Sequence, residues 1–275
     1  MKRSFKQPLW LGDQDLSNKT LLIHPEQGFG DSIQMFRYLN KFNSNKTNLI
    51  LIAYPGLKEL LSFNAKDTHV ICKGDPLPNF DYHCSTMSLP LAFNTSLNNI
   101  FNPSSYIKAD QKKINSWTNT LPRKTKPFIG IVWSGKSTHK NDKARSISFS
   151  KITSLFREDL QFISLQKDIS EHDSNIIKSN DNILHFGDQL KDFSDTAALT
   201  EHMDLIITVD TSVAHLSGAM GKPTWILTRF SPDWRWLLDR DDSPWYKSVK
   251  LFRQNSPNAW DDVLLKIKNE LSLIV

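Results

Sequence analysis

Short apolar runs separated by polar, glycine-containing turns form a first series between residues 21 and 84. Between these runs, apolar side chains recur at helical spacing from about Asp31 to Phe42 and again after Pro55, which is favoured in the first turn of a helix. The strands are predicted at Leu21–His24, Leu49–Ala53, His69–Cys72 and Asp81–Cys84. This alternation of strand and helix predicts a largely parallel sheet.

A second series with the same rhythm begins at residue 128, after a polar stretch that holds a helix at about Gln111–Thr118 and a linker at Leu121–Lys126. Its strands are predicted at Phe128–Trp133, Gln161–Leu165, Leu205–Val209, Thr224–Leu227 and Val249–Phe252. Its helices are predicted at Phe149–Phe156, Thr196–His202, Thr211–Met220 and Trp260–Leu271. The pattern indicates two α/β domains, 1–122 and 123–275, with the last helix free to pack back on the first domain.

Composition narrows the class of protein. The 275 residues carry a formal net charge of +5, which suits an anionic substrate or membrane surface. The basic residues are scattered among acidic ones, so we expect no nucleic-acid partner. Two cysteines are too few for a disulfide framework, and no apolar stretch has the length of a signal peptide core or a membrane span. These features predict a cytoplasmic protein.

The junction after the strand Leu205–Val209 is the strongest local signal for a ligand site. The buried strand ends at Asp210, and Thr211 or Ser212 can cap the helix that follows. The free N–H groups of such a helix start attract anions at the edge where open α/β sheets bind ligands. An ordinary capped helix packed on its sheet explains the same spacing equally well.

The segment Gly28-Phe-Gly-Asp31 occupies the corresponding place in the first domain. Its glycines permit a tight turn, and Asp31 is either a helix-capping residue or an acid facing a ligand. If the two sheets pack edge to edge, both strand-to-helix junctions face the same space. An acid on one side and an anion cradle on the other meet the needs of an inverting sugar transfer.

A basic loop follows the strand that ends at Trp133. Lys136, Lys140, Lys143 and Arg145 lie within ten residues and are either solvated charges or the groups that neutralise a diphosphate leaving group.

A later segment, from Phe230 to Tyr246, contains three of the eight tryptophans beside Arg235 and Arg240. Such rings pack in a core or stack on a base or sugar, and Trp133 and Trp234 are the candidates for stacking. The Asp13-Gln-Asp15 and Asp239-Arg-Asp241 motifs do not directly follow an apolar strand, so we expect no metal site.

In order along the chain, these segments resemble glycosyltransferase family 9, the lipopolysaccharide heptosyltransferases, and most of all the modules that follow tetratricopeptide repeats in bacterial proteins. The resemblance extends from about residue 8 to 271. The matching residues are His24 to Tyr38, Val132 to Gly135, His139 to Ser146, Asp195 to Ala198, Val209 to His215, Pro232 to Trp236 and Ser243 to Tyr246.

The resemblance implies a GT-B fold with two Rossmann-like domains, the acceptor on the first and the nucleotide-diphosphate sugar on the second. It implies inverting transfer without a metal or other cofactor. Asp31 matches the proposed general base. The donor site would be formed by Lys143, Arg145, Asp210, Thr211, Ser212 and His215, and acceptor contacts or support by Glu26, Gln27, Gln34 and Arg37.

The expected partners are a nucleotide sugar and a glycan, lipid-linked or protein acceptor in cell-surface glycan synthesis, at the inner face of a bacterial membrane. Glu26 and Gln27 replace less acidic residues of typical heptosyltransferases, which disfavours heptose as the sugar. Two other hypotheses about function stay open: a nucleotide-sugar epimerase of the same fold and a non-catalytic nucleotide-sugar-binding module. A Rossmann oxidoreductase is disfavoured because GxGxxG with a later acidic residue is missing.

Overall fold

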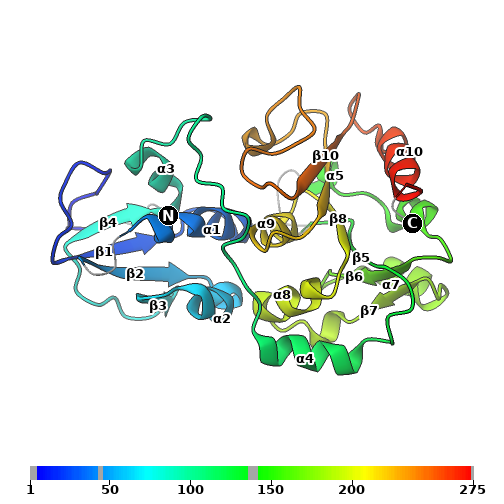
Figure 1. Cartoon of the computed structure of the whole chain (residues 1–275), viewed down its shortest axis with the longest axis horizontal. Coiled ribbons are helices and arrows are strands. Elements are labelled where there is room, and N and C mark those ends of the chain that lie inside the picture. Colours follow the sequence, from blue (N-terminus) through cyan, green and yellow to red (C-terminus); the bar gives the residue numbers. More distant parts are fainter. Residues whose placement is uncertain (1–4, 43–45, 136–141, 274–275) are drawn as a thin grey trace.

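A computed structural model describes residues 5–42, 46–135 and 142–273, which form two α/β domains (Figure 1). The first domain has a four-stranded parallel sheet in the order β3-β2-β1-β4. Its strands are β1 (Lys19–His24), β2 (Thr47–Ala53), β3 (Thr68–Cys72) and β4 (Tyr82–Ser85). Its helices are α1 (Phe29–Phe36), α2 (Pro55–Asn64) and α3 (Leu89–Ala92). The parallel sheet predicted from the apolar runs is confirmed.

Alternation along β1 and β2 divides the apolar side chains between the two faces of this sheet. Leu21 and Leu51 point to the face that α1 and α2 cover, where they belong to the main apolar cluster. Leu22 and Ile50 point to the opposite face, against Phe5 and Phe80. Both helices therefore lie on the side of the sheet that faces the second domain.

The second domain has a six-stranded parallel sheet in the order β10-β9-β8-β5-β6-β7. Its strands are β5 (Phe128–Val132), β6 (Gln161–Ser164), β7 (Ile183–His185), β8 (Leu205–Val209), β9 (Thr224–Thr228) and β10 (Val249–Arg253). The helices after the first domain are α4 (Gln111–Thr120), α5 (Asp142–Arg145), α6 (Phe149–Ile152), α7 (Glu171–Lys178), α8 (Phe193–Glu201), α9 (Ser212–Ala219) and α10 (Trp260–Leu271). The sequence pattern did not indicate β7 or α7.

One helix lies differently from the predicted division at residue 122, and the last helix lies within the predicted second domain. Trp117 of α4 shares an apolar cluster with Leu199 of α8, so α4 packs on the second domain although it precedes the predicted boundary. The apolar face of α10, with Val263 and Ile267, packs with Phe149 and other residues of the second domain. The alternative placement of this last helix on the first domain is therefore corrected. In the described part of the chain, no helix is long and apolar enough to cross a membrane.

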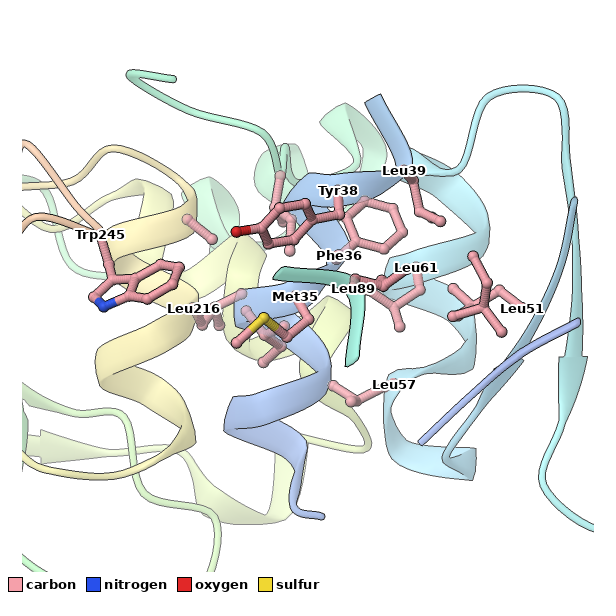
Figure 2. Packing of buried hydrophobic residues seen from close by; sticks show 14 of the residues in the cluster. Met35, Phe36, Tyr38, Leu39, Leu51, Leu57, Leu61, Leu89, Leu216 and Trp245 are labelled. Carbon is pink, nitrogen blue, oxygen red and sulfur yellow. The ribbon is translucent and has the colours of Figure 1, made fainter. Parts of the chain in front are cut away.

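The two domains share one apolar core along α1 and α9, which lie side by side in the middle of the molecule (Figure 1). Met35 of α1 points toward Leu216 of α9 and toward Trp245 of the segment between β9 and β10, and all three side chains are buried (Figure 2). Nearer the helix starts, Gly30 of α1 lies against the ring of His215 of α9.

Candidate active site at the domain junction

Asp31 lies in the first turn of α1, directly after β1 and its glycine-containing turn. Its Oδ2 accepts a hydrogen bond from the N–H of Gly28 at 2.7 Å. This is the contact expected of a residue that closes a helix start, so the capping role is present. The side chain is 16% exposed, which leaves part of the carboxylate accessible.

Arg235, from the loop after β9, holds the other oxygen of the same carboxylate. Its Nη2 donates to Oδ1 of Asp31, its Nε donates to Oε1 of Gln34, and its Nη1 lies 2.7 Å from Oδ1 of Asp233. The Arg235 side chain is only 5% exposed. A buried guanidinium from the second domain thus fixes the orientation of a carboxylate from the first, and such charge-assisted contacts are among the stronger hydrogen bonds in proteins.

The start of α9 is linked to this pair through Asp210: burial raises the pKa of its carboxyl, and the charge of Arg235 acts to lower it. Asp210 directly follows the strand β8, and Thr211 takes the capping position with extended backbone but makes no side-chain hydrogen bond to the helix start. Thr211 is buried and Ser212 half-buried. Free amides at such a helix start are suited to an anionic ligand.

Arg145, the last residue of α5, reaches the same strand end. Its Nη1 donates to the backbone carbonyl of Asp210 at 2.8 Å, and its Nε pairs with Asp142 at 3.3 Å. The absence of a side chain at Gly135 makes this possible, because a Cβ there would stand 2.2 Å from Nη2 of Arg145. Of the predicted basic loop, Lys136, His139 and Lys140 lie outside the described residues, and for Lys143 only the backbone is described.

Burial changes the acid–base chemistry of Asp210. Loss of solvent raises the pKa of its carboxyl from 3.8 to about 6, and the negative charge of Asp233 acts in the same direction. The neighbouring Trp236, Arg145 and Arg235 act in the opposite direction. A carboxyl at the start of α9 is therefore close to half-protonated at mildly acidic pH.

His215 lies one turn into α9 and is buried in the contact between the domains. Its Nδ1 lies 2.8 Å from the hydroxyl of Tyr246, and its ring stacks on Trp236. Burial, with the nearby Arg235, holds its pKa well below the ordinary value, so the ring is neutral. A Cβ at Gly30 would stand 2.5 Å from its Cδ2. His215 therefore lies in the contact between the domains, and its role in donor binding stays a prediction.

The candidates for acceptor contacts separate into two groups. Arg37 is fully buried and donates to the backbone carbonyls of Phe101 and Trp245 at 3.2 and 2.6 Å, which joins the domains. Gln34 is also fully buried and is held by Arg235. Both support the site, whereas Glu26 and Gln27 lie exposed on the turn before α1.

The two stacking candidates have opposite environments. Trp133 is 1% exposed, packs on Phe149 and donates from Nε1 to Asp173, so its predicted role in stacking on a ligand is wrong for this arrangement. Trp234 is 53% exposed, and the Arg235 guanidinium lies over its ring at 4.5 Å. Only Trp234 of this pair is available to a ligand.

Sequence reasoning noted Arg235 only as a neighbour of tryptophans. One feature of the sequence could have indicated its role. Arg235 stands between two tryptophans in the matched segment Pro232 to Trp236, and such neighbours can hold a guanidinium in place. Sequence reasoning also missed a second link between the domains, in which Lys113 pairs with Glu59 and Asp195 at 2.8 Å each. Among the described residues, no group of three or more His, Cys, Asp or Glu side chains is arranged to hold a metal ion.

The chain is similar in sequence to a curated bacterial protein and similar in fold to solved glycosyltransferases. No family model matches the chain. The protein FlbA of Caulobacter vibrioides is 23% identical over 288 residues, which is 95% of this chain and 48% of FlbA. The chain thus spans about half the length of the curated relative that it matches.

Solved structures resemble the chain over most of its length and over most of their own. A family 9 glycosyltransferase of Veillonella parvula has a TM-score of 0.64 at 12% identity, covering 94% of this chain and 90% of that one. The heptosyltransferase WaaC of Escherichia coli, solved with ADP-2-deoxy-2-fluoro heptose, has a TM-score of 0.60 at 10% identity, covering 93% and 100%. The dodecameric iron-containing heptosyltransferase TibC, in complex with ADP-D-β-D-heptose, has 0.60 at 12% identity, covering 94% and 78%. The chain therefore has the GT-B fold of the family 9 heptosyltransferases, as its motifs predicted.

Proposed function

We propose that this protein is a glycosyltransferase that moves a sugar from a nucleotide-diphosphate sugar to a hydroxyl group with inversion at the anomeric carbon and without a metal ion. The observation that carries the proposal is the position of Arg235, which contacts Asp31 of the first domain and also acts on Asp210 at the start of α9, where Arg145 donates to the Asp210 carbonyl. Such a transfer requires two elements at one junction: an oriented carboxylate, and a positively charged site that binds the anionic leaving group.

In the proposed reaction, Asp31 accepts the proton of the acceptor hydroxyl while that oxygen bonds to the anomeric carbon. The bond between this carbon and the diphosphate oxygen breaks on the opposite face, and the diphosphate leaves with the electron pair. The amides of Thr211 and Ser212, together with Arg145, stabilise its negative charge. Arg235 keeps the carboxylate oriented throughout.

The class of donor is supported by the related structures that hold ADP-heptose or its fluorinated analogue. For the present protein we propose only this class of donor, a nucleoside diphosphate bonded to a sugar. A glycan, a lipid-linked sugar or a protein side chain is the proposed acceptor, used at the inner face of the bacterial membrane.

A panel of nucleoside diphosphates and their sugars tests the proposal by thermal shift, followed by transfer assays with the stabilising donors. We expect at least one nucleotide sugar to raise the melting temperature and to lose its sugar to an added hydroxyl acceptor. Turnover of the nucleotide sugar alone into an isomer would instead indicate an epimerase. Binding without turnover in all assays would indicate a non-catalytic module.

A further inference from the structure

Trp234 presents an exposed aromatic surface next to Arg235, the residue that contacts the candidate general base. The Arg235 guanidinium lies over its ring at 4.5 Å and at the same time contacts Asp31. The indole also meets the buried ring of Trp245 edge-on, with 5.7 Å between centroids. Trp234 is therefore held in place on one side while 53% of its surface stays exposed.

A fixed indole flanked by polar groups has the chemistry of a carbohydrate-binding surface. The C–H groups of a pyranose ring pack on an aromatic face, and the ring hydroxyls need charged or polar partners at its edge. Here the adjacent Asp233 carboxylate is 35% exposed, which leaves it able to accept hydrogen bonds from hydroxyls. Phe230 and Leu238 are also exposed on this loop, but Trp234 is the residue connected to Asp31 through Arg235.

We infer that the exposed face of Trp234 is a subsite for a pyranose ring. This inference rests on the proposed function and specifies which residue of that site recognises sugar. The ring belongs either to the acceptor or to the sugar being transferred, and the chemistry of recognition is the same for both.

Fluorine NMR on protein labelled with 5-fluorotryptophan tests the subsite without any turnover. The resonance of Trp234 is assigned by its loss in Trp234→Phe. The probes are the methyl glycosides of glucose, galactose, mannose and N-acetylglucosamine, and the nucleotide sugars paired with their nucleoside diphosphates. We expect at least one sugar to shift the Trp234 resonance.

The pattern of shifts identifies the source of the ring. A shift caused by a methyl glycoside alone assigns the subsite to the acceptor. A shift caused by a nucleotide sugar but not by its nucleoside diphosphate assigns it to the transferred sugar. If none of these probes moves the Trp234 resonance, the inference is overturned, even where nucleotide binding moves other resonances.

Variants give a second, independent readout. Trp234→Ala should weaken binding of the shifting sugar by roughly three- to tenfold, the size expected for one aromatic contact, and Trp234→Phe should restore most of it. Phe230→Ala, a similarly exposed ring on the same loop, serves as the matched control and should leave sugar affinity unchanged. Equal losses in Trp234→Ala and Phe230→Ala would also overturn the subsite. Absence of transfer in the wild-type protein would contradict the proposed function, whereas the NMR result stands separately.

Discussion

Arg235 donates to Asp31 across the domain junction, and the two residues stand 204 positions apart in the chain. Because the N–H of Gly28 holds the other carboxylate oxygen, Asp31 is fixed at both oxygens. Each oxygen retains capacity for another hydrogen bond, so the same geometry that caps α1 leaves the group able to accept a proton. Capping and catalysis are therefore compatible at this position.

Asp31→Asn should fold but transfer sugar about 10²- to 10⁴-fold more slowly, because the amide cannot act as a base. Asparagine offers one acceptor oxygen where the carboxylate offers two, so either Gly28 or Arg235 loses its partner, at a cost of about 1–3 kcal/mol in the free energy of unfolding. Single-turnover kinetics measure the transfer rate, and urea denaturation measures the free energy of unfolding.

Asp233→Asn is the matched control for that variant, since Asp233 also contacts Arg235 but is not the proposed base. It should lower stability with a much smaller effect on the transfer rate. Equal rates for Asp31→Asn and the wild type would remove Asp31 from the mechanism, whatever happens to stability.

Arg145→Ala should weaken binding of a nucleoside diphosphate by roughly ten- to a hundredfold, because one charge-assisted hydrogen bond contributes about 1.5–3 kcal/mol. Binding of the matching nucleoside should not change. Calorimetric titration of both ligands measures this, with Lys143→Ala examined in parallel because the register of the basic loop leaves both residues as candidates. Wild-type diphosphate affinity in both variants would place the phosphate contacts elsewhere.

Transfer should persist in EDTA, since the proposed leaving-group charge is met by helix amides and cationic side chains. The assay compares rates before and after chelation and again with added Mg²⁺ or Mn²⁺. A loss of transfer in EDTA that either ion reverses would contradict the leaving-group assignment.

Asp210 should make stability depend on pH in a direction unusual for an aspartate. Its pKa in the folded state, about 6, lies above the value of 3.8 expected when unfolded. Its neutral form therefore favours the folded state below about pH 4, and this contribution is lost as the pH rises through 6. Asp210→Asn stays neutral, so its free energy of unfolding relative to the wild type should rise by roughly 1–3 kcal/mol from pH 4 to pH 7. Urea denaturation at several pH values measures the difference, and a flat profile would show that Asp210 is charged throughout.

The periodic part of the sequence predicted the fold well because each strand of a parallel sheet is a continuous apolar run. The runs at Leu21–His24 and Leu205–Val209 identified β1 and β8, whose ends lead into the candidate site. The strand β7, Ile183–His185, has only three residues, too few for such a run to be distinctive. The helix α7 has no fully buried residue among the described positions, so its apolar signal is weak.

The candidate site was only partly predictable because several of its contacts are long-range. Spacing within the sequence pointed to Asp31 and Asp210, each at the end of its own strand. It carried no information that Arg235 meets Asp31 or that His215 lies against Gly30, since these contacts depend on how α1 packs on α9. Trp133 was misjudged for a related reason: its indole N–H finds Asp173 within the second domain, which satisfies the ring in a buried position.

The apolar cluster that runs from Met35 to Leu216 couples the stability of each domain to the presence of the other. If either domain unfolded alone, its partner would expose the apolar face of α1 or α9 to water, and the buried Arg37 would lose its carbonyl partner at Trp245. We therefore expect the two domains to unfold together rather than one after the other, which a single transition in calorimetry would show. Each domain on its own would expose an apolar surface that favours aggregation. Combining one domain with an unrelated partner domain would therefore require redesign of the contact faces of α1 and α9.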